Sequence, residues 1–412
     1  MPKIRILETF SGIGAQHKSA KYVNKKYRKQ IFKVIGTCDW DAGAMMAYSA
    51  IHHKLGPESL ENILKKANLN NQEEIDLFLK LNTISMDSKK PIKDITSKES
   101  VYKKYLAAAK YISNNYNDIT QLDPKVLEQM QVDLLTYSFP CQGLSVANMG
   151  RDKGIFNEQS TSNLIWEVGR ILSNSKHKPK YLLLENVKQL VNKYAPEYKL
   201  WKKFLSKLGY KTFTGVFNAY DHGSLQIRER VFAISVLKEL KTPFKNDDQY
   251  ISYVNNLAKH KILKGQKAKQ KYYEIFDFKD LYPQESIWSL IKDTPSRRKI
   301  VKVCRNVFDE NNNKIKEYKI NTLTTKQDRI PNAGYIPYKH KKKDYLQYRF
   351  ITPRETYKIM GFEDSDYQKL IPLINLGLLN KNQLWRQAGN SIDINVLKSI
   401  FETIYQIDEM NK

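Results

Sequence analysis

The chain has 412 residues, and its 69 Lys and Arg against 43 Asp and Glu give a formal net charge of +26 at pH 7. A hydrophobic content of 41% excludes global disorder, and no apolar run reaches the roughly 18–20 residues that cross a bilayer. The N-terminus lacks the features of a signal peptide, and three widely spaced cysteines argue against disulfides or a Cys-rich zinc site. We expect a cytoplasmic protein that binds a polyanion, nucleic acid before membrane.

Predicted strands and helices alternate over the first 236 residues. The strands are short apolar or β-branched runs at 4–10, 32–38, 132–138, 180–184 and 230–236. Helical stretches separate them at 15–27, 42–66, 163–173 and 197–208. This alternation predicts an α/β fold on a parallel, doubly wound sheet. The polar stretch 67–116 is predicted to be an insertion without a derivable role, and the segments after 237 are charged and weakly periodic until a helix returns near 391.

The first predicted strand ends in a glycine loop that opens a helix. Gly12 and Gly14 let backbone N–H groups approach a ligand closely, but the third glycine of the dinucleotide fingerprint is His17 here, which argues against NAD or FAD. A donor without a pyrophosphate, such as S-adenosylmethionine, needs only the tight turn. Asp39 is placed to hold a ribose diol, and Asp118 to accept a bond from an adenine amino group. Taken singly, these are also ordinary turn and helix-cap residues.

Further polar residues are predicted at strand ends. Cys141 and Glu185 each follow an apolar strand, and Gln226, Arg228 and Arg230 alternate onto one face before the next strand. Each has an ordinary explanation, as a buried thiol, a helix cap or a surface ion pair. Together they fit one chemistry, in which a thiolate adds to C6 of cytosine, a carboxylic acid bonds N3 and a guanidinium lies near O2. Zinc deamination is excluded, because no second Cys follows Cys141 at the required spacing.

The ordered set of motifs resembles the DNA (cytosine-5)-methyltransferase family over nearly the whole chain. The resemblance is greatest to single-chain bacterial members, which include restriction-modification and CpG-methylating enzymes. The segments that carry it are 10–14 (FSGIG), 139–142 (FPCQ), 185–187 (ENV), 226–230 (QIRER), 349–362 with Arg354 and Glu355, and 387–391 (QAGNS). The resemblance implies a Rossmann-like, S-adenosylmethionine-dependent methyltransferase domain with a smaller DNA target-recognition domain.

The resemblance also implies three sets of site residues and no metal. The catalytic set is Cys141 as nucleophile, Glu185 as the N3 contact, Arg228 and Arg230. The donor-binding set is Phe10, Gly12, Gly14, Asp39, Trp40, Asp118, Pro140, Asn390 and Ser391. The DNA-recognition set is Gln142, Ser145, Thr322, Leu323, Thr324, Gln327 and Arg329.

The chain departs from the family's pattern at three places. Residues 161–164 (TSNL) stand where many members carry an Arg, Asn117 replaces the Gly usual before Asp118, and Asp393 stands where Pro or Ser is frequent. These departures concern single donor contacts. The basic run 339–343 (KHKKK) is either a solvated loop or a phosphate contact.

We expect residues 1–236 with 380–412 to form the catalytic domain and 237–379 the target-recognition domain. The expected reaction methylates C5 of a cytosine flipped out of double-stranded DNA, with residues 142–160 as a closing loop and S-adenosylhomocysteine as product. A monomer on the bacterial nucleoid is expected, with a cognate restriction endonuclease as one partner that acts on the same site without a stable complex. Two alternatives stay open: methylation of tRNA cytosine, known in a eukaryotic branch of the family, and a catalytically silent DNA-binding protein.

Overall fold

The computed structural model describes residues 4–140, 154–156, 160–304 and 318–412. The chain divides into two compact units. The first unit comprises Met1–Phe217, Glu229–Leu257 and Leu397–Lys412, and the second comprises Asn218–Arg228 and Ala258–Val396. Within the described ranges, no helix combines the length and the apolar character that a membrane crossing requires.

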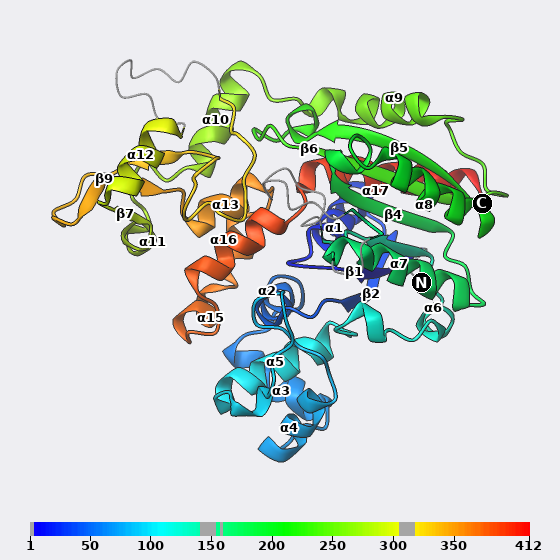
Figure 1. Cartoon of the computed structure of the whole chain (residues 1–412), viewed down its shortest axis with the longest axis horizontal. Coiled ribbons are helices and arrows are strands. Elements are labelled where there is room, and N and C mark those ends of the chain that lie inside the picture. Colours follow the sequence, from blue (N-terminus) through cyan, green and yellow to red (C-terminus); the bar gives the residue numbers. More distant parts are fainter. Residues whose placement is uncertain (1–3, 141–153, 157–159, 305–317) are drawn as a thin grey trace. The chain divides into compact units, whose positions relative to one another are not determined.

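A six-stranded sheet in the order β2-β1-β3-β4-β6-β5 forms the centre of the first unit (Figure 1). Its strands are β1 (Ile4–Thr9), β2 (Phe32–Cys38), β3 (Leu134–Tyr137), β4 (Tyr181–Val187), β5 (Tyr210–Asn218) and β6 (Glu229–Leu237). β1 pairs in parallel with β2 and β3, and β3 pairs in parallel with β4. The strands β3 and β4 are buried almost throughout, as in a sheet covered on both faces. The predicted α/β class is confirmed.

Two features of the sheet differ from the prediction. β6 runs antiparallel to β4, and β5 was not predicted at all. Only residues 219–228 link β5 to β6, fewer than the dozen or so that a crossover between parallel strands requires. The prediction of a wholly parallel sheet is therefore wrong at β6.

The helices α1 to α9 and α17 belong wholly or mainly to the first unit. They are α1 (Ala15–Tyr27), α2 (Ala42–His53), α3 (Pro57–Lys66), α4 (Gln72–Lys80), α5 (Ser100–Ile112), α6 (Lys125–Gln129), α7 (Ile165–Asn174), α8 (Ala195–Lys207), α9 (Asp247–Ala258) and α17 (Ile394–Met410). The single helix predicted over 42–66 is two helices, because Gly56 is extended and Pro57 starts a new helix at a position that proline favours. The predicted insertion contains α4 and α5, and α5 packs against α2, α3 and α4.

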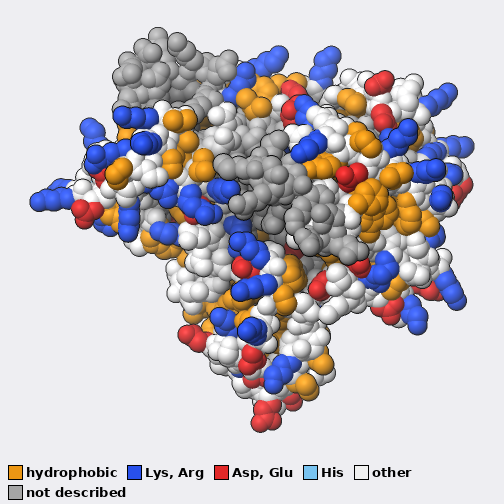
Figure 2. Space-filling view, viewed as in Figure 1, with side chains coloured by type: hydrophobic (Ala, Val, Ile, Leu, Met, Phe, Trp, Pro, Cys, Tyr) orange, Lys and Arg blue, Asp and Glu red, His pale blue; other side chains and the backbone are white. Residues whose placement is uncertain are grey.

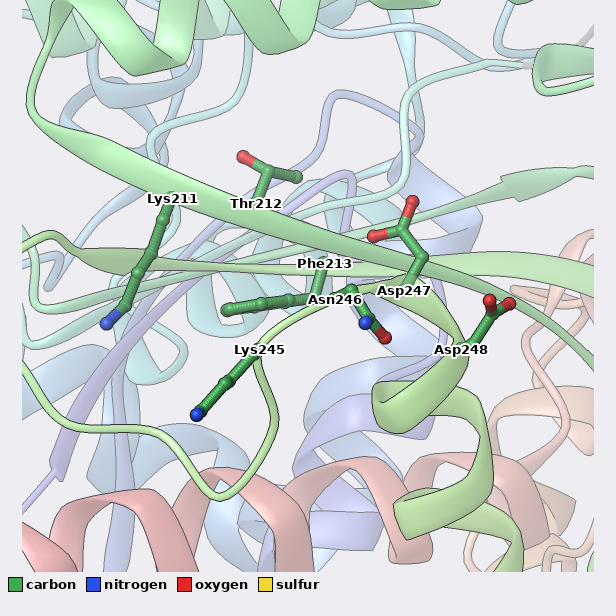
Figure 3. Close-up of a pocket in the computed structure, with 7 residues that line it drawn as sticks. All are labelled: Lys211, Thr212, Phe213, Lys245, Asn246, Asp247 and Asp248. Atoms are coloured by element: carbon green, nitrogen blue, oxygen red, sulfur yellow. The ribbon is translucent and has the colours of Figure 1, made fainter.

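The edge strand β5 is shielded by charged residues. Figure 3 shows a shallow groove with Lys211, Thr212 and Phe213 of β5 on one wall and residues 245–248 at the start of α9 on the other. The Asp247 carboxylate accepts a hydrogen bond at 2.9 Å from the backbone N–H of Thr214, within β5. Because exposed edge N–H groups invite pairing with another chain, this arrangement protects the sheet. We therefore interpret this groove as part of the protected sheet edge.

The second unit is built on a three-stranded antiparallel sheet in the order β7-β9-β8. The strands are β7 (Leu290–Lys292), β8 (Tyr335–Pro337) and β9 (Tyr345–Phe350). The helices around them are α10 (Gly265–Ile275), α11 (Pro283–Trp288), α12 (Pro295–Val303), α13 (Pro353–Ile359), α14 (Asp364–Gln368), α15 (Ile371–Asn375) and α16 (Lys381–Asn390).

A buried ion pair fixes the junction of β9 and α13. The guanidinium of Arg349 donates to both carboxylate oxygens of Glu355, at 2.8 and 2.9 Å, and to the carbonyl of Asp277 at 3.0 Å. Arg354 pairs with Glu285 at 2.8 Å. The segment 349–362, which carries part of the family resemblance, thus contributes buried charge pairs to the interior of the second unit.

Candidate active site and donor pocket

The glycine loop follows β1 and forms an open turn. Phe10, Gly12 and Gly14 all have positive φ, at 54°, 52° and 78°, and the backbone N–H of Gly12 donates to Asp39 Oδ2 at 2.8 Å. Among the residues that the structure describes, no heavy atom lies within 4 Å of the position that a Cβ on Gly12 would occupy. The turn therefore leaves open space beside a backbone that is already fixed to a carboxylate at the end of β2.

Aromatic and polar side chains fill the space beneath this loop. A Cβ on Gly14 would stand 2.3 Å from His52 Nε2 and 2.7 Å from Tyr48 Cε2, so only glycine fits. His52 Nε2 lies 3.0 Å from the carbonyl oxygen of Ile13, and the Tyr48 hydroxyl donates to Glu8 Oε2 at 3.0 Å. Burial raises the pKa of Glu8 to about 8. The sequence did not predict these supports, because His52 and Tyr48 look like ordinary positions of a buried helix.

Asp39 is held in a defined orientation at the end of β2. Its second carboxylate oxygen accepts a hydrogen bond from the backbone N–H of Asp41 at 2.9 Å. Burial, reinforced by the nearby Asp41 charge, raises the pKa of Asp39 to about 6. Trp40, the next residue, is partly exposed. The carboxylate is thus fixed by two backbone N–H groups at the edge of the glycine loop.

The chain returns from the insertion directly beside Asp39. Asn115 forms a parallel bridge with Thr37 of β2, and its side-chain oxygen accepts from the backbone N–H groups of Asp39 at 3.4 Å and Asn117 at 2.6 Å. Asp118 follows, and its Oδ1 accepts from the backbone N–H of Thr120 at 2.9 Å. Asn115 is thus bonded to the backbone of Asp39, and Asp118 follows three residues later in the chain.

The segment that leads to the predicted nucleophile is tethered at three points. Ser138 Oγ donates to the carbonyl of Phe10 at 3.4 Å, Asn186 Nδ2 to the carbonyl of Phe139 at 3.0 Å, and Ser162 Oγ to the carbonyl of Pro140 at 2.7 Å. These bonds join the end of β3 to the glycine loop, to the end of β4 and to the residues before α7. Cys141, Gln142 and Ser145 lie outside the described residues.

Glu185 and Arg230 lie together where β4 ends and β6 begins. In the antiparallel register Val187 faces Arg230, and Arg230 Nε lies 3.6 Å from Glu185 Oε1. The two side chains are only 19% and 11% exposed, for Arg230 and Glu185 respectively. A carboxyl and a guanidinium are therefore presented side by side, next to the tethered segment before residue 141.

Arg228 occupies a different environment. The strand β6 begins at Glu229, after Arg228. Burial alternates over 226–230, with Gln226 and Arg228 buried and Ile227 and Glu229 exposed. The buried Arg228 guanidinium donates to the carbonyls of Leu323 at 2.8 Å, Gly389 at 3.1 Å and Ser391 at 2.9 Å. Arg228 thus holds backbone segments of the second unit together.

The segment 322–329, in which the sequence predicts DNA-recognition residues, is anchored at its start. Gln226 Oε1 accepts from the backbone N–H of Leu323 at 2.8 Å, and Thr322 Oγ1 donates to the carbonyl of Ile227 at 2.6 Å. Thr324 is partly exposed. Gly389 must be a glycine here, since a Cβ would stand 2.6 Å from the Thr324 carbonyl carbon.

Gln327 and Arg329 have contrasting positions. Gln327 is fully buried, donates to the carbonyl of Gly334 at 2.9 Å and accepts from the backbone N–H of Ala333 at 3.2 Å. Its amide therefore closes a loop in this structure instead of facing outwards. The Arg329 side chain, on that loop, is 64% exposed.

The remaining predicted donor residues belong to the second unit. Asn390 ends α16 and is exposed, whereas Ser391 is buried. Nearby Asp393 accepts from the backbone N–H of Asn395 at 2.9 Å and lies 3.5 Å from Gln226 Nε2. Burial raises the pKa of Asp393.

Basic side chains gather on the second unit. Figure 2 shows Lys and Arg side chains over β9 and α12. α12 carries Arg297, Arg298, Lys299 and Lys302, and the exposed run 341–343 precedes β9. This surface has the charge that phosphate contacts require.

Comparisons with known proteins identify the family of the chain. The sequence model of the family described as C-5 cytosine-specific DNA methylase matches residues 89–406. The chain is 32% identical over 414 residues to the orphan methyltransferase M.SssI of Spiroplasma monobiae, covering 98% of this chain and 97% of that protein. It is 29% identical over 409 residues to the type II methyltransferase M2.ScrFI of Lactococcus lactis subsp. cremoris, covering 98% and 99%.

Solved structures support the fold. The Dnmt2 methyltransferase of S. pombe superposes with a TM-score of 0.60 at 15% identity, over 98% of each chain. The predicted resemblance is thus confirmed by a family match over most of the chain and by relatives of nearly equal length. The chain belongs to the C-5 cytosine-specific DNA methyltransferases and is a DNA (cytosine-5-)-methyltransferase.

Proposed function

We propose that the chain transfers a methyl group from S-adenosylmethionine to C5 of a cytosine flipped out of a short duplex DNA target, through a covalent adduct of Cys141 at C6. The observation that carries this proposal is the pairing of Glu185 with Arg230 beside the tethered segment before Cys141. A carboxyl and a guanidinium at one place suit the N3 and O2 edge of a pyrimidine.

The donor pocket suits S-adenosylmethionine, the methyl donor of the family. The open space at Gly12 and the fixed Asp39 carboxylate fit a nucleoside without a pyrophosphate. Asp39 would accept from the ribose hydroxyls and Asp118 from the adenine amino group, with Trp40 beside them. The bound donor supplies an electrophilic methyl group. Across the part of the chain that the structure describes, no group of three or more His, Cys, Asp or Glu residues is placed to hold a metal ion.

The proposed chemistry uses three side chains of the first unit. The Cys141 thiolate forms a bond to C6, and the electron pair of the C5–C6 double bond makes C5 nucleophilic. Glu185 in its acid form bonds N3 and stabilises the charge that develops on the ring, while Arg230 holds O2. C5 would take the methyl group as the bond between that group and the donor's sulfur breaks, which leaves S-adenosylhomocysteine. Transfer of the C5 proton to solvent water would then restore the C5–C6 double bond as the bond between C6 and the Cys141 sulfur breaks and the thiolate leaves.

We assign sequence recognition to the second unit. Because every target presents the same flipped cytosine, the choice of sequence must depend on side chains that contact flanking bases. Exposed Arg329 has the geometry for a bidentate contact with guanine. Gln327 supports its loop, and Arg228 anchors the segment that precedes it. This assigns Arg228 a positioning role in place of the predicted catalytic one.

Methyl transfer and covalent trapping test this function together. The purified chain with labelled S-adenosylmethionine should label duplex DNA and not tRNA. Duplex DNA containing 5-fluorocytosine should trap the wild type covalently, because fluorine cannot leave as the C5 proton does. Cys141→Ser should not be trapped, whereas Cys304→Ser, which changes a cysteine of the second unit, should trap like the wild type. Trapping of Cys141→Ser would overturn the assignment, and labelling of tRNA alone would establish the alternative substrate.

A further inference from the structure

Lys110 lies in the last turn of α5 and anchors the chain that follows. Its Nζ donates to the carbonyl of Asn115 and to Oδ1 of Asn117, each at 2.5 Å. The ammonium also lies 5.7 Å from the centre of the Phe78 ring of α4. Burial lowers the pKa of Lys110 to about 8. The lysine thus joins two helices of the inserted segment to the turn that precedes Asp118.

The residue that Lys110 holds has an uncommon backbone conformation. Asn117 has φ 57° and is 2% exposed, and it stands where the family resemblance expects Gly. A left-handed conformation is unfavourable for most residues, although Asn tolerates it better than others. Its side-chain oxygen is fixed by Lys110 and its backbone N–H by Asn115, so both ends of the residue are constrained.

The same turn is bonded to the end of β2. Cys38 Sγ donates to the carbonyl of Asn117 at 3.2 Å, and the backbone N–H of Asp39 donates to the Asn115 side chain at 3.4 Å. The spacing between Asp39 and Asp118 therefore depends on the conformation of residues 115–117. A change in that conformation would move Asp118 relative to Asp39.

We propose that Lys110 is a positioning residue of the donor pocket and that the inserted helices α4 and α5 serve to hold it there. By fixing Asn115 and Asn117, Lys110 sets Asp118 opposite Asp39 for the nucleoside of the methyl donor. The inference rests on the proposed function, namely that S-adenosylmethionine binds at these two acids.

Titration calorimetry with S-adenosylmethionine tests the lysine directly. Lys110→Met removes two charge-assisted hydrogen bonds and should weaken donor binding by about tenfold or more. The value of KM for the donor should rise equally, while kcat at saturating donor and the affinity for duplex DNA stay near those of the wild type. The control is Lys104→Met on the same helix, whose exposed ammonium pairs with Glu61 at 3.0 Å and which should bind the donor normally.

Substitutions of Asn117 test the turn without altering the lysine. Glycine adopts a positive φ without help from neighbouring side chains, so Asn117→Gly should bind the donor within about threefold of the wild type. Alanine does not, so Asn117→Ala should bind the donor about tenfold more weakly. Combining Lys110→Met with Asn117→Gly should restore most of the affinity lost in Lys110→Met. If Lys110→Met is poorly folded, the two Asn117 variants decide the question alone.

The outcomes separate this inference from the proposed function. If the wild type does not bind S-adenosylmethionine, the proposed donor is wrong. If the wild type binds it and Lys110→Met binds within twofold, or if the Gly and Ala variants of Asn117 behave alike, Lys110 does not position the pocket.

Discussion

Arg228 and Arg230 are two residues apart, yet the structure predicts opposite consequences when each is replaced by Met. Arg228 donates from a buried position to three backbone carbonyls of the second unit. Arg230 has a partly exposed side chain beside Glu185. We expect Arg228→Met to reduce stability and Arg230→Met to reduce turnover.

The magnitudes follow from these surroundings. A hydrogen bond from a charged group contributes about 1.5–3 kcal/mol. The three bonds of Arg228 are not additive, because the freed carbonyls can relax, so we expect a loss of about 3–5 kcal/mol in the free energy of unfolding. Arg228→Lys keeps the positive charge, so its free energy of unfolding should fall by less than that of Arg228→Met. The Arg230–Glu185 pair is a single, longer contact, with an N–O distance of 3.6 Å, so its loss should reduce the free energy of unfolding by less than the loss of the three Arg228 bonds.

Denaturant unfolding of the purified variants, followed by single-turnover methylation at saturating donor and DNA, measures both quantities. Arg230→Met should slow the chemical step by about 10²–10³-fold, as for the loss of a donor to a developing charge. A folded population of Arg228→Met should keep a chemical step near that of the wild type. The reasoning is refuted if Arg228→Met is as stable as the wild type, or if Arg230→Met methylates at the normal rate.

Three further predictions concern the ligands. Because the pKa of Asp39 is about 6, its carboxylate becomes protonated as the pH falls below 6. Calorimetry should therefore show that the donor affinity of the wild type falls below pH 6, and that the affinity of Asp39→Asn changes far less. A wild-type affinity that does not depend on pH would contradict the role of Asp39 in binding the donor. With a net charge of +26, duplex binding should weaken by orders of magnitude between about 50 and 200 mM salt, and a flat salt dependence in filter binding would argue against phosphate contacts. Arg329→Ala should relax the methylated sequence while Lys342→Ala lowers affinity evenly across sequences, and unchanged methylation maps for Arg329→Ala would exclude that residue from recognition.

The sequence predicted best those elements whose burial is evident from a run of apolar residues. A polar residue follows each of the short, largely apolar strands β2, β3 and β4, and the glycine loop follows β1. Both the positions of these strands and the residues at their ends could therefore be predicted. β5 was missed because its sequence, YKTFTGVFN, mixes Lys, Thr and Gly with aromatic residues and lies at a sheet edge. The direction of β6 depends on the length of a connection that cannot be judged until β5 is known.

The individual roles of site residues were harder to predict than their presence. Gln327 and Arg329 both have long polar side chains, and only the tertiary structure shows that Gln327 is fully buried while the Arg329 side chain is 64% exposed. Arg228 and Arg230 belong to one motif, but β6 begins between them. Residue type identifies candidates, whereas the side chain's environment decides between supporting a loop and contacting a ligand.

Departures from the family's pattern are matched by partners elsewhere in the chain. Asn117, in place of Gly, has its side chain bonded to Lys110. Asp393, in place of Pro or Ser, accepts from Asn395 and lies 3.5 Å from Gln226 Nε2. A polar group introduced into a buried position costs stability unless it is hydrogen-bonded, so each departure and its partner form one unit of structure. Replacing Asn117 alone leaves Lys110 its hydrogen bond to the Asn115 carbonyl, and replacing Asp393 alone leaves Gln226 Nε2 its contact with Met360 Sδ at 3.4 Å. Each single replacement should therefore remove one polar interaction of the partner and not all of them.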